Sequence, residues 1–159
     1  MTRALNRVLL VTGAAATALT VVAAPADAAP RSKGTTTVAP SALTLSVLRG
    51  LTGPAQLTSS GAVFGITGRS GGTVIKHVGG LRLAELDPAT AATSLTLSNF
   101  WIDTTTHTVS AIVDDGSRAT VFAVDGAGVL TFTDAASQAV TGSGAITGQV
   151  AGTASVAPA

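Results

Sequence analysis

Short stretches in which apolar and polar side chains alternate follow one another through most of the chain. The clearest group spans 94–125, where the residues TTTH join two alternating runs and a third run follows an Asp-Asp-Gly-Ser turn. Such alternation is typical of a β-strand with one face in a protein core. The runs recur at intervals of roughly 8 to 12 residues with Gly or Asp turns between them. The pattern therefore predicts an all-β protein, an antiparallel β-sandwich or open barrel of about 7 to 9 short strands.

The apolar positions change parity within the strand that precedes TTTH. Leu95 and Leu97 alternate with polar residues, whereas Phe100 and Ile102 fall on the opposite parity. Successive side chains of a strand point to opposite faces, so one inserted residue is needed before all four can share a face. We therefore predict a β-bulge near Ser98-Asn99.

Phe100 and Trp101 are consecutive on this strand, so their side chains face opposite ways. We expect one of them to be buried and the other to be exposed or at a rim. Trp101 is the only tryptophan, and the chain has no tyrosine. If Trp101 is the exposed member, it is the best single contact residue on the surface. If the bulge turns it inward, it is the largest filler of the core.

Glycines and mixed patterns define the remaining elements. Gly79-Gly80 lies between two β-patterned runs and predicts a turn or bulge that bends one strand into the next. Val121 and Ala123 make their run apolar on both faces, which indicates a central strand. In Ser41–Leu51 we favour a strand followed by one helical turn, and we expect a loop over Asp134–Gly144.

The N-terminus has the parts of a secretory signal peptide. Arg3 and Arg7 precede an uncharged, largely apolar run, and Pro-Ala-Asp-Ala follows it. A basic region, an apolar region and an A-x-A site predict a helical signal peptide over 1–28, cleaved after Ala28. The alternative is a retained membrane anchor, but the run is short for a span and is diluted by threonines and a glycine. We therefore expect a secreted protein at the cell surface or outside the cell, in contact with the membrane only transiently.

The rest of the chain suits one domain. Residues 29–40 are rich in Pro, Thr and Gly without periodicity, and they predict a flexible leader. A single β-domain should occupy 41–156, and residues 157–159 should form a frayed C-terminus.

Composition narrows the classes of function. The chain has no cysteine, so thiol catalysis and thiolate metal sites are excluded. Charged residues make up only 11%, and the formal net charge of +1 falls to zero when Arg3, Arg7 and Asp27 leave with the signal peptide. Such a surface has no electrostatic footprint for nucleic acid. It also gives little colloidal protection, which allows self-association or attachment to a surface.

Catalytic and metal-binding motifs are weak in this sequence. No Gly-x-Ser-x-Gly elbow occurs, and Asp114-Asp115 lies in a turn where aspartate is favoured for backbone hydrogen bonding. His77 and His107 show no metal-binding spacing. If these histidines met on neighbouring strands, they could bind one metal ion or flank a flat ligand. Otherwise they are two solvent-facing polar residues, and we expect no catalytic residue and no metal site.

Five segments together resemble a known family. They are FGITG (Phe64–Gly68), IKHVGGLRL (Ile75–Leu83), LTLSNFWID (Leu95–Asp103), HTVSAIV (His107–Val113) and RATVFAVD (Arg118–Asp125). The chain is similar here to a family of small secreted actinobacterial proteins, whose strand order resembles the Htaa-type domains of cell-surface haem-uptake proteins. The resemblance implies an exported β-sandwich. Htaa-type sites use a tyrosine axial ligand supported by a histidine. Tyrosine is missing here, and His77, which lies in the segment that matches the family's His-x-Gly-Gly-Leu, is the candidate axial ligand that the resemblance implies.

Three functional hypotheses follow. The first is a non-enzymatic secreted β-sandwich that binds an extracellular or cell-wall partner or has a structural role at the cell surface, without a cofactor. Its expected contact is the Phe100–Trp101 edge. The second is a haem-binding module of the Htaa type in iron acquisition, using His77 and with His107 as a further candidate. The third is a secreted hydrolase, which the absence of a nucleophile motif disfavours.

Overall fold

The structure is a computed structural model that describes residues 33–85, 94–114 and 116–159. The predicted signal peptide over 1–28, with its cleavage site at Ala28, lies outside these residues. Among the described residues, no helix is long and apolar enough to cross a membrane.

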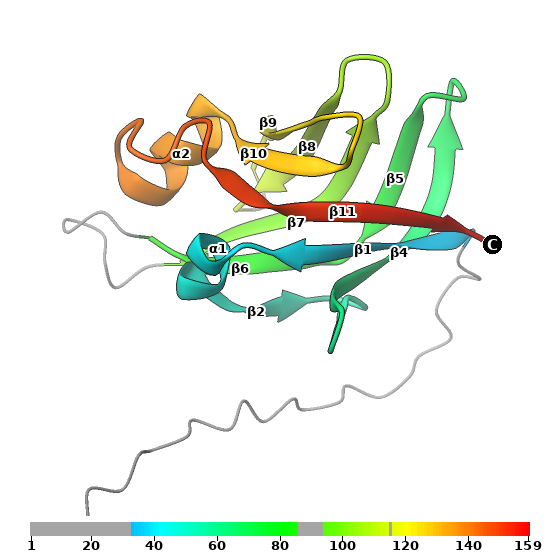
Figure 1. The fold of residues 1–159 in the computed structure, drawn as a ribbon, viewed down its shortest axis with the longest axis horizontal. Coiled ribbons are helices and arrows are strands. Elements are labelled where there is room, and N and C mark those ends of the chain that lie inside the picture. The colour runs from blue at the N-terminus through cyan, green and yellow to red at the C-terminus, as the bar shows by residue number, and fades with distance from the viewer. Residues whose placement is uncertain (1–32, 86–93, 115) are drawn as a thin grey trace, which may run out of the picture.

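Strands dominate the described chain, and two short helices accompany them (Figure 1). The strands are β1 (Gly34–Pro40), β2 (Leu48–Thr52), β3 (Gln56–Thr58), β4 (Gly61–Ser70), β5 (Val74–Val78), β6 (Gly80–Ala84), β7 (Ser94–Asp103), β8 (Thr108–Val113), β9 (Arg118–Val124), β10 (Val129–Phe132) and β11 (Val150–Pro158). The helices are α1 (Ala42–Val47) and α2 (Asp134–Thr141).

Eight strands close into an antiparallel barrel. Their order is β7-β5-β4-β1-β11-β10-β9-β8, and β8 pairs back to β7. Outside this ring, β6 pairs with the first half of β7, β2 pairs with β6, and β3 pairs with the start of β4. The all-β antiparallel prediction is confirmed. The core is enclosed by one sheet that closes on itself, so the barrel is closed, and neither the expected two-sheet sandwich nor the expected open barrel is formed. The described residues form eleven strands, more than the predicted 7 to 9.

The two ends of the domain meet in this ring, because β1 lies between β4 and β11. Gly34 pairs with Pro158 and Pro40 pairs with Gly152. The prediction of a flexible leader over 29–40 is therefore wrong from Gly34 onward, and so is the frayed end for residues 157 and 158. The Thr-rich sequence of β1 does not show the alternation that predicts a strand, because the buried position at Thr36 is occupied by a polar residue.

Both helices lie where the pattern predicted something else. Ser41–Leu51 contains helix first and strand second, because the Ser41 hydroxyl accepts a hydrogen bond from the Thr44 backbone N–H and caps α1. Helix α2 replaces the loop expected over Asp134–Gly144. Thr133 caps its start through the Ala136 N–H, and Gly142 ends it in the left-handed conformation at φ 65°.

The bends within the strands agree with the pattern. The β7–β8 register shifts between Ser98 and Trp101, and Asn99 has a φ of 52°, so the predicted bulge is confirmed. Gly79 has a φ of 96° and separates β5 from β6, which both pair with β7. The chain therefore bends there as the double glycine predicted.

The core fills the barrel and continues under the helices. Two aromatic pairs meet edge to face with ring centroids 5.4 Å apart, Phe64 with Phe100 and Phe122 with Phe132. Helices α1 and α2 lie toward the same end of the barrel, away from the C-terminus (Figure 1). The same core cluster includes Val47 of α1 and Val140 of α2. These residues place apolar side chains at the helical end.

Candidate functional site

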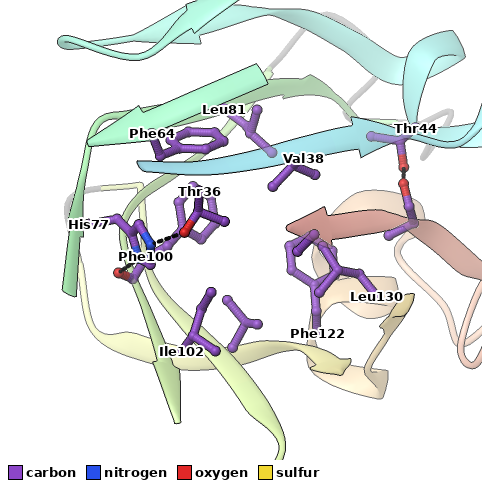
Figure 2. Close-up of a pocket in the computed structure, with 13 residues that line it drawn as sticks. Thr36, Val38, Thr44, Phe64, His77, Leu81, Phe100, Ile102, Phe122 and Leu130 are labelled. Carbon is purple, nitrogen blue, oxygen red and sulfur yellow. Dashed lines mark hydrogen bonds between the residues drawn. The ribbon is translucent and has the colours of Figure 1, made fainter. Parts of the chain in front are cut away.

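The barrel interior holds a small cavity. Its volume is about 40 Å³, room for one or two water-sized groups. Most of its wall is apolar, and the polar members are Thr36, Thr44 and His77 (Figure 2). The apolar members are Val38, Phe64, Leu81, Phe100, Ile102, Val109, Phe122, Leu130, Ala151 and Ala154. Side chains from opposite walls of the barrel therefore converge on one apolar space.

His77 is buried in this wall with both ring nitrogens engaged. Its side chain is 4% exposed. Nδ1 lies 3.2 Å from the Phe100 carbonyl oxygen, and Nε2 lies 2.7 Å from the Thr36 hydroxyl (Figure 2). Because a carbonyl only accepts, Nδ1 carries the proton, and in the neutral ring Nε2 accepts from Thr36. The expectation of a solvent-facing His77 is wrong. The ring instead connects β5 with β1 and β7.

Burial lowers the pKa of His77 below its usual value of 6.5, and the hydrogen bond to Phe100 opposes this shift only in part. As the pH falls through 6.5, the unfolded chain takes up a proton that the folded chain resists. We therefore expect full stability above about pH 6.5 and a decline below it, by about 1.4 kcal/mol for each unit that separates the two pKa values. Urea unfolding between pH 7.5 and 5 measures this decline.

The control for this pH effect is a variant that leaves both histidines in place. His77→Gln should reduce the decline of the unfolding free energy at low pH, whereas Leu57→Ala, an exposed change on β3, should leave it as in the wild type. An equal decline in the wild type and in His77→Gln would contradict the assignment to His77.

A wider hollow lies at the opposite end of the barrel from the helices, and we call it the mouth. Its volume is about 340 Å³. It is lined by Ile75, Ile102, Thr104, His107, Val124, Asp125, Gly126, Ala127, Gly128, Ala154 and Val156. Ile102 and Ala154 line both the mouth and the interior cavity. These two side chains therefore form the boundary between the two spaces.

His107 lies on the mouth and not in the cavity. Its side chain is exposed, and its φ of 55° places it in the turn between β7 and β8. The structure therefore separates the two histidines, since His77 lines the interior and His107 lines the mouth. Within the described part of the chain, no group of three His, Cys, Asp or Glu side chains is arranged to hold a metal ion.

Trp101 lies on the outer wall of the barrel. Its side chain is half-buried, whereas that of Phe100 is 7% exposed and lines the interior. The prediction that the two side chains face opposite ways and that one of them is buried is therefore confirmed, with Trp101 as the more exposed member. Two cations cover the indole ring, with Lys76 Nζ 4.5 Å and Arg118 Cζ 3.8 Å from the ring centroid. Trp101 belongs to neither hollow.

Comparisons with known proteins leave the family open. No family model, curated protein or solved structure matches the chain. The resemblance to Htaa-type domains therefore stays a prediction.

Sequence reasoning missed Thr36, Ile102 and Ala154 as residues of the site. A usable signal existed for His77, because it shares the parity of buried Ile75 in the same strand. No comparable signal existed for Ala154, because its position at the boundary depends on the closure of the barrel.

Proposed function

We propose that the protein is a secreted, non-enzymatic binding module that takes a small apolar ligand into the barrel through the mouth. The observation that carries this proposal is the shared wall of the two hollows at Ile102 and Ala154. Eight-stranded barrels are just wide enough to be filled by side chains or to hold one small ligand. Here the side chains fill most of the interior and leave an apolar space beside the mouth.

The sizes of the two hollows define the class of ligand. The interior cavity of about 40 Å³ accepts a slender group such as the end of an alkyl chain. The mouth, at about 340 Å³, has room for the larger part of the molecule. Thr104, His107 and Asp125 line the mouth beside its apolar residues, so a polar end of the ligand has hydrogen-bonding partners there.

Export and a non-enzymatic role are part of the same proposal. Export is supported by the signal-peptide pattern of residues 1–28. The non-enzymatic part of the proposal is supported by the hydrogen bonds of His77. Both of its ring nitrogens bond within the barrel wall, so neither is free to exchange a proton with a substrate. The expected contact changes from the Phe100–Trp101 edge to the barrel interior, where Phe100 is one of the lining residues.

Titration with the dye N-octyl-dansylamide, whose alkyl tail is slender enough for the interior cavity, tests this function. We expect a saturable rise of dye fluorescence with the wild-type protein. Ala154→Phe fills the boundary between mouth and cavity and should weaken binding by about tenfold or more, about 1.4 kcal/mol. Ala123→Phe is the matched control, because Ala123 is exposed on β9 and lines neither hollow. No saturable signal, or equal weakening in both variants, would contradict the proposal.

Haem binding is a second candidate function, and the position of His107 favours it. This exposed imidazole lines the mouth next to Ile102 and Val124, an apolar rim of the kind that a flat ligand contacts. His77 is the less suitable axial ligand, because ligation through Nε2 would break its bond to Thr36. Haemin titration should then give a Soret band that His107→Ala abolishes and His77→Ala retains. The absence of a spectral change at micromolar haemin would exclude this candidate.

A further inference from the structure

The outer wall of the barrel carries a row of paired residues centred on Trp101. Lys76 of β5 pairs with Trp101 of β7, and Trp101 pairs with Ser110 of β8. Side chains at directly paired positions lie on the same face of a sheet. The β7 bulge determines which side chains lie on the outer face, because it turns Phe100 into the barrel and leaves Trp101 outside.

Arg118 reaches this row from β9 and is held in place by three oxygen atoms. Its Nη1 donates to the Asn99 carbonyl at 2.9 Å, to the Ser110 carbonyl at 3.2 Å and to the Ser110 hydroxyl at 3.3 Å. All three acceptors are neutral, so these bonds fix the guanidinium without cancelling its charge. A guanidinium has five N–H donors, and the three on Nε and Nη2 are not used in these bonds.

We propose that Lys76 and Arg118, mounted on the Trp101 ring, form a second binding site that takes a tetrahedral dianion, a phosphate or sulfate group of an extracellular ligand. The two positive charges match the charge of such a group. The planar guanidinium fork binds its oxygens in pairs, and the lysine ammonium acts as a point charge. Stacking on the indole limits the motion of both cations before the anion arrives.

The nearest acidic side chain along β7 is engaged elsewhere. Asp103 follows Trp101 by two residues, and its Oδ1 accepts from the Thr105 and Thr106 backbone N–H groups in the β7–β8 turn. These bonds lower the pKa of Asp103 and keep its carboxylate on the turn. The site is distinct from the barrel interior, since Lys76, Trp101 and Arg118 line neither hollow.

The single tryptophan makes the site directly observable. Trp101 is the only Trp and the chain has no Tyr, so intrinsic fluorescence reports on this location. We expect inorganic phosphate or sulfate to change the Trp101 fluorescence saturably at constant ionic strength, with acetate binding more weakly. The tighter of the two dianions identifies the chemical source. Lys76→Gln should weaken the binding by about tenfold, since a charge-assisted hydrogen bond is lost.

Two control variants separate dianion binding at this site from a general effect of surface charge and from binding in the barrel. Arg69→Gln removes an exposed cation of β4 and should leave the affinity unchanged. Ala154→Phe should block the dye in the barrel but retain phosphate or sulfate binding, so failure of one proposal leaves the other testable. Isothermal titration calorimetry measures each affinity independently of changes in indole environment. The proposal is overturned if acetate and chloride give the same response as the dianions, or if Arg69→Gln weakens binding as much as Lys76→Gln.

Discussion

Replacement of Phe132 by alanine is expected to lower the free energy of unfolding by about 3 to 5 kcal/mol. The Phe132 side chain is 2% exposed, and its ring meets Phe122 edge to face at 5.4 Å. The substitution removes the burial of a large ring, leaves a cavity and breaks an aromatic pair. Because β10 is one strand of the closed ring, its neighbours β9 and β11 cannot both move inward to fill the space.

Urea unfolding followed by circular dichroism measures this loss. Leu57→Ala is the control, because Leu57 is 43% exposed on β3, outside the ring. The control should change the unfolding free energy by less than about 1 kcal/mol. A loss below about 1.5 kcal/mol for Phe132→Ala would contradict this account, because it would mean that the neighbouring strands move inward and fill the cavity.

Replacement of Gly61 by alanine is expected to cost about 2 to 5 kcal/mol, the sum of backbone strain and overpacking. Gly61 has a φ of +128°, which side chains rarely adopt. A Cβ there would clash with the Val38 carbonyl oxygen of β1. Since β1 is also paired with β11 on its other edge, it cannot shift away without breaking the pairing that closes the barrel.

Gly68 on the same strand is the matched control for this prediction. It has no atom within 4 Å of an added Cβ and no positive φ. Gly68→Ala should therefore be neutral or slightly stabilising, by up to about 1 kcal/mol. Equal melting temperatures for the two alanine variants would contradict the tight β1–β4 contact.

The local features of β7 could be predicted because one strand contains all the information they need. The parity change between Leu97 and Phe100 requires an inserted residue whatever the strand pairs with. The opposite orientations of Phe100 and Trp101 follow from the same geometry. The turn at Gly79 is similar, since it depends on a backbone conformation that glycine adopts readily.

The closure of the barrel could not be predicted in this way. It depends on the pairing of β1 with β11, strands from opposite ends of the domain. The sequence of β1 is largely threonine, and the buried Thr36 becomes a suitable interior residue only because His77 bonds to its hydroxyl. His77 is distant in the sequence, so the composition of β1 considered by itself resembles that of a flexible leader.

The candidate site was difficult to predict for the same reason, because its residues come from strands that are distant in the sequence. The orientation of His77 could be inferred from its parity with Ile75, but its partner on β1 could not. Ile102 and Ala154 come together only when the ring is closed. Lys76 and Arg118 meet on Trp101 through the pairing of β5 with β7, β7 with β8 and β8 with β9, and the register of these pairs could not be predicted either. The sequence therefore identified single candidate residues more reliably than the residues they contact in the fold. Those contacts determine the role of each candidate residue.

Methyl NMR with the bound dye tests the central claim, that ligand enters the barrel through the mouth, most directly. Isotope-labelled Ile, Leu and Val methyl groups would be followed during titration with N-octyl-dansylamide. The barrel proposal predicts chemical-shift changes and dye contacts at Ile102, Val109 and Leu130, which line the cavity. Changes confined to Leu45 and Leu57, exposed apolar residues outside the cavity, would contradict it.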